Sequence, residues 1–316
     1  MSDSPTEDAF AADVLAGLSE RPRAIPAKWF YDERGSRLFD EITRLEAYYP
    51  TRVARSILTE HADAIVDAIG KHSTLVEYGS GSSDKTRILL DALHARRTLA
   101  AYVPIDISEA FLHQTADRLR QSYPGLPVLP LAADYTRPYA LPDLPEASQR
   151  VVVFFPGSTI GNLAADEAAE FLRHVAQVVG PGGALLLGVD QWKDTGVLRR
   201  AYDDDRGVTA AFNLNLLRRI NRELAGDADL DAWSHHVRVN EGRRRVEMHL
   251  RSERDQTLTV CGRPFGFAEG ETIHTENSHK VTADSMAALA GAAGLARRQR
   301  WTDPDGWFAV ELYEVA

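Results

Sequence analysis

An acid followed by a short glycine-rich turn marks the part of the sequence with the clearest chemical pattern. An apolar run ends in Glu77, then Gly79 and Gly81 follow, and a helical pattern occupies residues 85–93. Glycines at such a strand-to-helix turn let the backbone approach a ligand closely. A dinucleotide-binding fingerprint would have a third glycine where this sequence has Asp84. The acid suits the ammonium group of S-adenosylmethionine better; an ordinary turn without a ligand is the alternative.

Two later strand ends carry side chains that suit a nucleoside. Asp106 closes the apolar run 101–106, where a carboxylate can accept both hydroxyls of a ribose. Asp134 and Tyr135 follow the run 128–132, where hydrogen bonding and stacking suit an adenine ring. Asp134 has a second interpretation, because aspartate often starts a turn of this kind.

These side chains need a sheet that brings the strand ends together. Strand and helix patterns alternate from residue 74 to residue 189, and a continuous apolar run at 151–155 is typical of a central parallel strand. Ser108 is the expected cap of a helix at 109–121. Ligands of such sheets bind outside the carboxyl ends of the strands. We therefore expect the loops 77–83, 106–108, 134–135 and 156–163 to converge.

The alternation stops after Asp190, and helices followed by strands with period-two patterning take its place. The pattern at 246–251 predicts an antiparallel strand with one buried face. The many aromatic residues between 29 and 49 favour a satellite core over the main domain. The predicted division is an N-terminal segment 1–55 that joins the substrate-binding domain, a cofactor-binding domain 56–194, a substrate-binding insertion 195–280, and a return to the first domain at 281–316.

Composition excludes several classes of function. The net charge of −10 argues against binding to the phosphate backbone of nucleic acids. One cysteine, Cys261, and the lack of an HExxH spacing lead us to expect no metal. The polar N-terminus and the lack of a long apolar run predict a cytoplasmic protein without a membrane span. We expect a monomer.

Five motifs in order resemble the histidine-specific methyltransferases, which use S-adenosylmethionine to make trimethylhistidine (hercynine) for ergothioneine biosynthesis. The resemblance covers roughly residues 25–316. It rests on Phe-Asp-Glu-Ile-Thr-Arg-Leu (39–45) with Tyr-Tyr-Pro-Thr-Arg (48–52), Glu-Tyr-Gly-Ser-Gly-Ser-Ser-Asp-Lys-Thr (77–86), Phe-Phe-Pro-Gly-Ser-Thr-Ile-Gly-Asn-Leu (154–163), Ala-Tyr-Asp-Asp (201–204) with Gly-Val-Thr-Ala-Ala-Phe-Asn (207–213), and Ile-His-Thr-Glu-Asn-Ser (273–278).

The resemblance implies an α/β fold, a Rossmann-like class I methyltransferase sheet with an inserted α+β substrate-binding domain. It also implies cofactor contacts: Gly79 with the methionine part, Lys85 near the carboxylate, Asp106 on the ribose, and Asp134 with Tyr135 on the adenine.

For the substrate, L-histidine, the resemblance implies that Asn162 and Tyr202 hold the α-carboxylate. Glu276 and Ser278 would hold the imidazole, with Tyr49 close by. Since Glu276 and Ser278 are two residues apart, an extended segment points both side chains the same way. Without the resemblance, a solvated strand face would be the preferred interpretation of that pair.

Methyl transfer to nitrogen is an in-line displacement that needs an unprotonated amine held at attack distance. Room for three methyl groups calls for a small or apolar wall, for which Gly161 and the Phe30-Tyr31 segment are candidates, and Tyr31 could also hydrogen-bond the amine. Met248 is a candidate for the imidazole side, although methionine on such a strand is more often core. Two alternatives stay open: methylation of another aromatic amine such as a tryptophan derivative, and a catalytically silent cofactor-binding protein.

Overall fold

The computed structural model describes residues 5–80, 84–107 and 109–315, which form two compact units. The sheet unit contains Pro50–Trp192 and Val281–Ala316, and the inserted unit contains Met1–Tyr49 and Lys193–Lys280. Gly81 of the glycine-rich turn and Ser108, the expected helix cap, lie outside the described residues.

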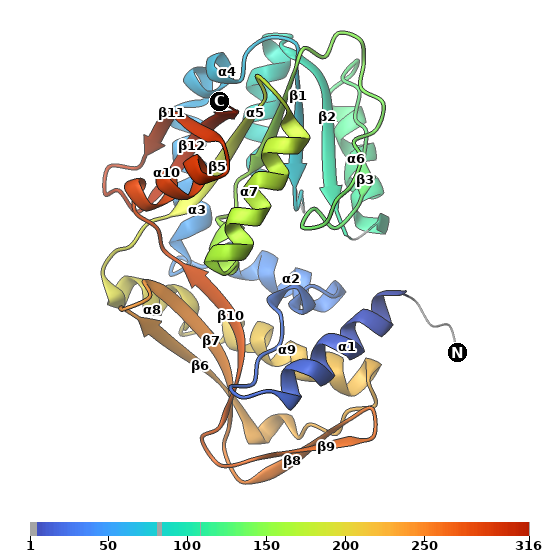
Figure 1. Cartoon of the computed structure of the whole chain (residues 1–316), viewed down its shortest axis with the longest axis vertical. Coiled ribbons are helices and arrows are strands. Elements are labelled where there is room, and N and C mark those ends of the chain that lie inside the picture. Colours follow the sequence, from blue (N-terminus) through green and yellow to red (C-terminus); the bar gives the residue numbers. More distant parts are fainter. Residues whose placement is uncertain (1–4, 81–83, 108, 316) are drawn as a thin grey trace. The chain divides into compact units, whose positions relative to one another are not determined.

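A seven-stranded sheet is the frame of the sheet unit, in the order β11-β12-β5-β4-β1-β2-β3 (Figure 1). Its strands are β1 (Ser73–Tyr78), β2 (Leu99–Asp106), β3 (Leu131–Ala132), β4 (Arg150–Phe155), β5 (Ala184–Asp190), β11 (Leu295–Thr302) and β12 (Phe308–Val315). Paired neighbours run parallel except at β12, which is antiparallel to β5 and to β11. The chain leaves β1 towards β2 on one side and returns to β4 on the other, so the strand order reverses between β1 and β4. Ligands of open α/β sheets bind at such a switch point.

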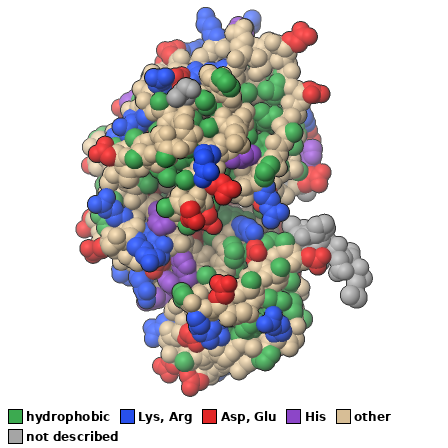
Figure 2. Space-filling model, in the orientation of Figure 1, with side chains coloured by type: hydrophobic (Ala, Val, Ile, Leu, Met, Phe, Trp, Pro, Cys, Tyr) green, Lys and Arg blue, Asp and Glu red, His purple; other side chains and the backbone are tan. Residues whose placement is uncertain are grey.

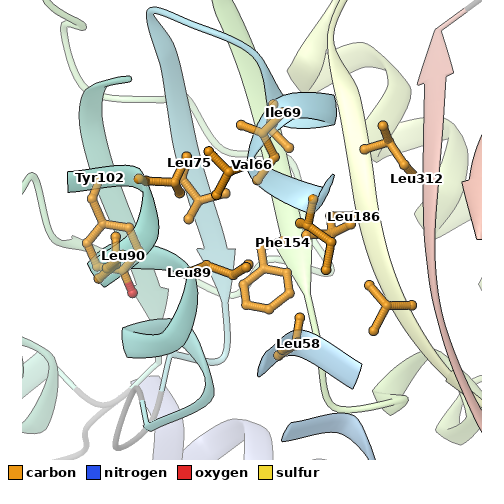
Figure 3. Packing of buried hydrophobic residues seen from close by; sticks show 14 of the residues in the cluster. Leu58, Val66, Ile69, Leu75, Leu89, Leu90, Tyr102, Phe154, Leu186 and Leu312 are labelled. Atoms are coloured by element: carbon orange, nitrogen blue, oxygen red, sulfur yellow. The ribbon is translucent and has the colours of Figure 1, made fainter. Parts of the chain in front are cut away.

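Helices cover both faces of this sheet, as the predicted Rossmann-like α/β fold requires. One face packs against α3 (Tyr49–Glu60), α4 (Ala62–Ile69), α5 (Asp84–Ala95) and α6 (Glu109–Ser122). Figure 3 shows part of that core, where Phe154 lies between Leu89 and Leu186. The other face packs against α7 (Ala165–Val179) and α10 (Ala283–Ala292). Sheet residues alternate between the two cores because successive side chains of a strand point to opposite faces. The predicted Rossmann-like fold is confirmed.

The inserted unit combines helices with a small antiparallel sheet. Three strands pair in the order β10-β7-β6, and β8 pairs with β9. The strands are β6 (Trp233–Asn240), β7 (Arg245–Ser252), β8 (Gln256–Val260), β9 (Arg263–Phe267) and β10 (Thr272–His279). The helices are α1 (Pro5–Ser19), α2 (Glu33–Ile42), α8 (Thr195–Tyr202) and α9 (Val208–Glu223), with short 3₁₀ turns η1 (Ala27–Phe30) and η3 (Leu230–Ala232).

The N-terminal aromatic residues pack within the inserted unit, which is the part of the protein that the N-terminal segment is predicted to join. The ring of Phe30 lies 4.6 Å from that of Phe212 on α9, and Phe39 lies 5.9 Å from the same ring. Asp32 starts α2 by accepting from the backbone N–H of Gly35 at 2.7 Å. The same carboxylate accepts from the side-chain amide of Asn215 at 2.8 Å, which ties the start of α2 to α9.

The prediction for residues 246–251 was correct about the antiparallel strand and wrong about its open face. β7 is the central strand of its sheet, and Glu247 and His249 on the second face are 4% and 7% exposed. Although burial raises it, hydrogen bonds from Arg245 and Asn240 lower the pKa of Glu247 to about 2. Neighbouring strands can cover a charged position on a central strand when its charge is paired in this way. In Figure 2, histidines in purple lie among charged side chains at the surface.

Two further segments belong to the sheet unit. The apolar residues before β1 lie on two helices, α3 and α4, which are separated by His61. The expected third strand at 128–132 shortens to the two residues of β3 and an isolated bridge at Val128.

Candidate active site

The strand ends at 77–79, 106 and 134–135 converge at one edge of the sheet unit. Tyr78 pairs with Ile105, and Asp106 pairs with Ala132, so these positions lie side by side across three strands. The backbone N–H of Gly79 donates to the carbonyl of Ile105 at 2.9 Å. The β1 loop therefore starts beside Asp106, as the parallel register requires.

Tyr135 covers the start of this loop. Its ring stacks on Tyr78, with centroids 5.0 Å apart and planes inclined by 5°. Gly79 has φ = +65°, a left-handed conformation that glycine adopts without strain. A Cβ added to Gly79 would lie 3.9 Å from Cε1 of Tyr135. The bare backbone and the aromatic ring together form the kind of surface that a purine nucleoside can lie against.

Glu77 is enclosed at the base of the same loop. Its side chain is 2% exposed, and the hydroxyls of Thr86 and Tyr102 both donate to its carboxylate. Burial raises the pKa of Glu77 to about 7, against the lowering effect of these two hydrogen bonds. The carboxylate that we expected to partner a ligand's ammonium therefore also ties α5 and β2 to β1.

Lys85 stands in the first turn of α5, close enough to Glu77 for their charges to interact. Burial lowers the pKa of Lys85, and the negative charge of Glu77 raises it. A cation near a helix N-terminus is placed where anions bind well, because the helix also presents free N–H groups there. This position suits the carboxylate of an amino-acid-like ligand.

Asp134 starts a turn, which was its second interpretation. Its Oδ1 accepts from the backbone N–H of Thr136 at 2.9 Å and from the hydroxyl of Thr136 at 2.5 Å. Its Oδ2 lies 3.6 Å from Nε of the exposed Arg137. These contacts give both carboxylate oxygens of Asp134 a partner within the turn, so its role towards adenine stays a prediction.

The loop after β4 carries Gly161 and Asn162 in the 3₁₀ turn η2 (Thr159–Asn162). The hydroxyl of Ser158 accepts from the backbone N–H of Asp190 at 2.9 Å, which fastens the loop to β5. Gly188 on β5 is required there, since a Cβ at this residue would lie 2.2 Å from the carbonyl oxygen of Pro156. Gly161 is buried and its N–H donates to the carbonyl of Ser158 at 2.9 Å.

In the inserted unit, a β-bulge sets the direction of Glu276 and Ser278. The register of β10 against β7 shifts between His274 and Glu276, so that Glu276 pairs with Met248. Thr275, the extra residue, donates to Oδ1 of the buried Asn213 on α9 at 2.8 Å. A bulge turns the following side chains to the other face of the sheet. Glu276 and Ser278 consequently share the face of Met248, which is 2% exposed and belongs to the core.

Ser278 meets Tyr202 and a buried cation. The hydroxyls of Ser278 and Tyr202 are 2.7 Å apart, and Nζ of Lys280 donates to each of them at 2.8 Å. Lys280 is 3% exposed. Burial raises the pKa of Glu276 to about 7, and the positive charge of Lys280 opposes that rise. The structure thus joins two of the residues predicted to bind substrate through a lysine that the sequence patterns missed.

Tyr49 has a second lysine as its partner. Nζ of Lys193 donates to the hydroxyl of the buried Tyr49 at 2.6 Å and lies 4.3 Å from the centre of its ring. Tyr31 is 37% exposed and makes edge contacts with the rings of Phe39 and Phe212. A partly exposed phenol at the border of an aromatic cluster can reach a ligand.

Neither lysine was predicted, and only one had a usable signal. Lys280 continues the spacing of Glu276 and Ser278 by two residues, so extending that strand pattern would have found it. Lys193 stands at the end of the strand–helix alternation, where its neighbours show no period.

Within the ranges that the structure describes, no group of three or more His, Cys, Asp and Glu side chains has an arrangement that could hold a metal ion. Among these residues there is also no helix of the length and hydropathy that a membrane span needs.

Comparison with known proteins identifies the family. The model of a family described as histidine-specific, S-adenosylmethionine-dependent methyltransferases matches residues 10–315. The chain belongs to this family. The match covers both units, so the sheet and the insertion are parts of one family architecture.

Named relatives show how far the family extends. A histidine N-alpha-methyltransferase of Mycolicibacterium smegmatis is 44% identical over 313 residues, which cover 98% of this chain and 96% of the relative. The ergothioneine biosynthesis protein 1 of Neurospora crassa is 30% identical over 89% of this chain and 32% of the relative. A 4-dimethylallyltryptophan N-methyltransferase of Aspergillus fumigatus is 25% identical over 95% of this chain and 91% of the relative.

Proposed function

We propose that this enzyme transfers three methyl groups in succession from S-adenosylmethionine to the α-amine of L-histidine, giving hercynine for ergothioneine biosynthesis. The observation that carries the proposal is the arrangement of Glu276 and Ser278 on one face of β10. A neutral imidazole has one N–H and one nitrogen lone pair. A carboxylate beside a hydroxyl offers an acceptor and a donor to that ring. An indole has an N–H and no lone pair, and would leave the hydroxyl unmatched.

We assign the methyl donor to the sheet unit. Gly79 and Tyr135 would border its nucleoside, Asp106 would accept from the ribose hydroxyls, and Lys85 would pair with the carboxylate. The fit rests on the uncovered backbone at Gly79, the ring stacked beside it and the acid at the end of β2. S-adenosylmethionine supplies a methyl group on a positively charged sulfur when it is bound. The role of Asp134 towards the adenine is part of this assignment.

We assign the amino acid to the inserted unit, with Asn162 of the sheet unit as a further donor. Tyr202 and Asn162 would hold the α-carboxylate, while Glu276, Ser278 and Tyr49 would surround the imidazole. The contact between Tyr202 and Ser278 fits one ligand. The inner nitrogen of the imidazole is close to the α-carbon of histidine, so adjacent hydroxyls can reach both groups.

The chain's part in the reaction is to hold an unprotonated amine. Nitrogen attacks the methyl carbon with its lone pair as the carbon–sulfur bond breaks and the sulfur leaves as a neutral thioether. The first and second products lose a proton before the next attack, and the third transfer leaves a quaternary ammonium. Burial and nearby positive charge both favour the neutral amine. Tyr31 would hydrogen-bond the amine, and Gly161 would leave room for the methyl groups.

Incubation of the protein with S-adenosylmethionine and a panel of amino acids tests the proposal, with product masses as the readout. A histidine mass raised by three methyl groups is the expected result. Methyl gain on 4-dimethylallyltryptophan but not on histidine would favour the alternative substrate class, and no transfer to any amine would point to a silent protein. Glu276→Ala should weaken histidine binding and leave cofactor binding intact; equal loss of both would refute the assigned role. The monomeric state and cytoplasmic location remain predictions, which sizing chromatography and cell fractionation can test.

A further inference from the structure

A buried ammonium group organises the hydroxyls of the amino-acid pocket. Lys280 follows β10 directly, and its backbone N–H donates to the carbonyl of Arg244 at 2.8 Å, which fixes the residue against the β6–β7 turn. Its Nζ donates at 2.8 Å to the hydroxyls of Ser278 and Tyr202, and it lies 4.7 Å from the ring centre of Tyr202.

An ammonium group can only donate hydrogen bonds. Ser278 and Tyr202 therefore each use an oxygen lone pair to accept from Lys280, and their own hydroxyl hydrogens must point elsewhere. With the two hydroxyl oxygens 2.7 Å apart, at most one hydrogen can lie between them. The pair is consequently biased to act as a donor towards any third group.

Lys280 also acts on Glu276. The two residues are four apart on a segment where the even positions share a face, and the positive charge of Lys280 favours the ionised form of Glu276. The positions opposite Glu276 and Ser278 on β7 are Met248 and Val246, which are buried and carry no charge. On β6, the neighbour of Met248 is Val237, also buried. From α8 come Tyr202 and the cation of Arg199, whose Nη1 donates to the carbonyl of Val237 at 3.0 Å, and Nε2 of His235 on β6 lies 2.8 Å from the carbonyl oxygen of Tyr202.

We propose that Lys280 is a positioning residue that sets the hydrogen-bond polarity of the pocket: it holds Ser278 and Tyr202 as donors and Glu276 as an ionised acceptor. The pocket then selects a ligand with one ring N–H, one ring lone pair and an anionic group, which is the pattern of neutral histidine. This inference rests on the proposed function and extends it, because none of the residues predicted to bind histidine explains why the hydroxyls should donate.

Two substitutions separate the charge of Lys280 from its hydrogen bonds. Lys280→Met removes both, and Lys280→Gln removes the charge but keeps a donor. We expect both to raise the KM for histidine near neutral pH by on the order of tenfold, because Glu276 ionises only at higher pH in these variants. At about pH 9, where Glu276 is ionised, the KM of both variants should fall back part of the way to the wild-type value. Cofactor affinity should stay unchanged. Lys71→Met, an exposed lysine in the turn before β1, is the matched control.

The double variant with Glu276→Gln and Lys280→Met tests the coupling. If Lys280 acts through Glu276, adding Lys280→Met to the Glu276→Gln variant should leave the pH profile of its KM nearly unchanged. A Lys280→Met or Lys280→Gln protein with the wild-type pH profile for KM would overturn the inference, as would a pH-independent rise in KM. Wild-type enzyme that does not methylate histidine would instead contradict the proposed function, so the two failures are distinguishable.

Binding to the wild-type protein provides a test that needs no variant to fold. Pyrrolylalanine has a ring N–H and no ring lone pair, so its ring offers the hydroxyl of Ser278 no acceptor. Calorimetry should show it binding on the order of tenfold or more weakly than histidine, the usual effect of an unmatched buried polar group. Equal affinity of the two ligands would refute the donor polarity assigned to Ser278.

Discussion

Replacing Glu77 by Gln should make the protein more stable at neutral and alkaline pH. Burial raises the pKa of this carboxyl from an ordinary value of 4.5 to about 7. Below about pH 4.5 the group is protonated in the folded and the unfolded chain. As the pH rises towards 7, the unfolded chain releases a proton that the folded chain still holds, so folding stability declines and remains lower above pH 7. The two pKa values correspond to a loss of about 3 kcal/mol.

Glutamine avoids that loss because it has no charge to bury. Its amide oxygen can accept from one of the hydroxyls of Thr86 and Tyr102, and its NH₂ group can donate to the other, since a hydroxyl does both. For a chain of this length, about 3 kcal/mol corresponds to roughly a 5 °C rise in the melting temperature. The rise should be present at about pH 8 and vanish near pH 4.

Thermal unfolding of both proteins across this pH range measures the effect, with the exposed Glu60→Gln as the control. Cofactor affinity provides a second readout of opposite sign: loss of the negative charge should weaken the binding of a cationic methyl donor. A Glu77→Gln protein that is less stable than wild type at pH 8, or a stability difference that does not change with pH, would refute the reasoning.

Three other substitutions test separate parts of the structure. Tyr135→Ala should weaken cofactor binding roughly tenfold or more by calorimetry, since stacking on a base contributes about 1–3 kcal/mol, and Tyr135→Phe should keep most of the affinity. Gly79→Ala should lower the free energy of unfolding in urea by about 1–2 kcal/mol, because a side chain is strained at φ = +65° although its Cβ has room; an unchanged value would argue against that conformation. Thr275→Val should lower the free energy of unfolding by about 1–3 kcal/mol and raise the KM for histidine, because the hydroxyl that anchors the bulge to Asn213 is lost. A lower free energy of unfolding with an unchanged KM would show that the bulge does not direct Glu276.

The sheet unit was largely predictable from its sequence because its signals are local. A doubly buried strand such as 151–155 is an uninterrupted apolar run, and each turn after a strand carries its own small or acidic residues. The parallel register then brings Gly79, Asp106 and Tyr135 to one edge without further information. Asp134 shows the limit of this reasoning, since the same aspartate suits a turn and a ligand, and the structure shows the turn.

The inserted unit was harder to predict because its determining contacts join distant segments. The alternation at 246–251 gives a strand, but whether its second face is open depends on β6 and β10 and on the pairing of Glu247 with Arg245. The bulge at Thr275 depends on Asn213, 62 residues earlier. A period-two pattern cannot reveal a shift of one residue whose cause lies on another element.

Glu77 and Glu276 lie on different units and share one physical design. In each, burial raises the pKa of a carboxyl to about 7 while a lysine in its field, Lys85 or Lys280, opposes the rise. A carboxylate in such surroundings is a strong acceptor, because water competes poorly with a ligand there. A ligand that brings a positive charge or an N–H must lower the pKa further, so its binding releases a proton near pH 7. The methyl donor and the amino acid should therefore both bind more tightly as the pH rises through 7, each because of its own carboxylate. Glu77→Gln should abolish the proton release on binding of the methyl donor and leave that of histidine unchanged. Glu276→Gln should have the opposite pattern.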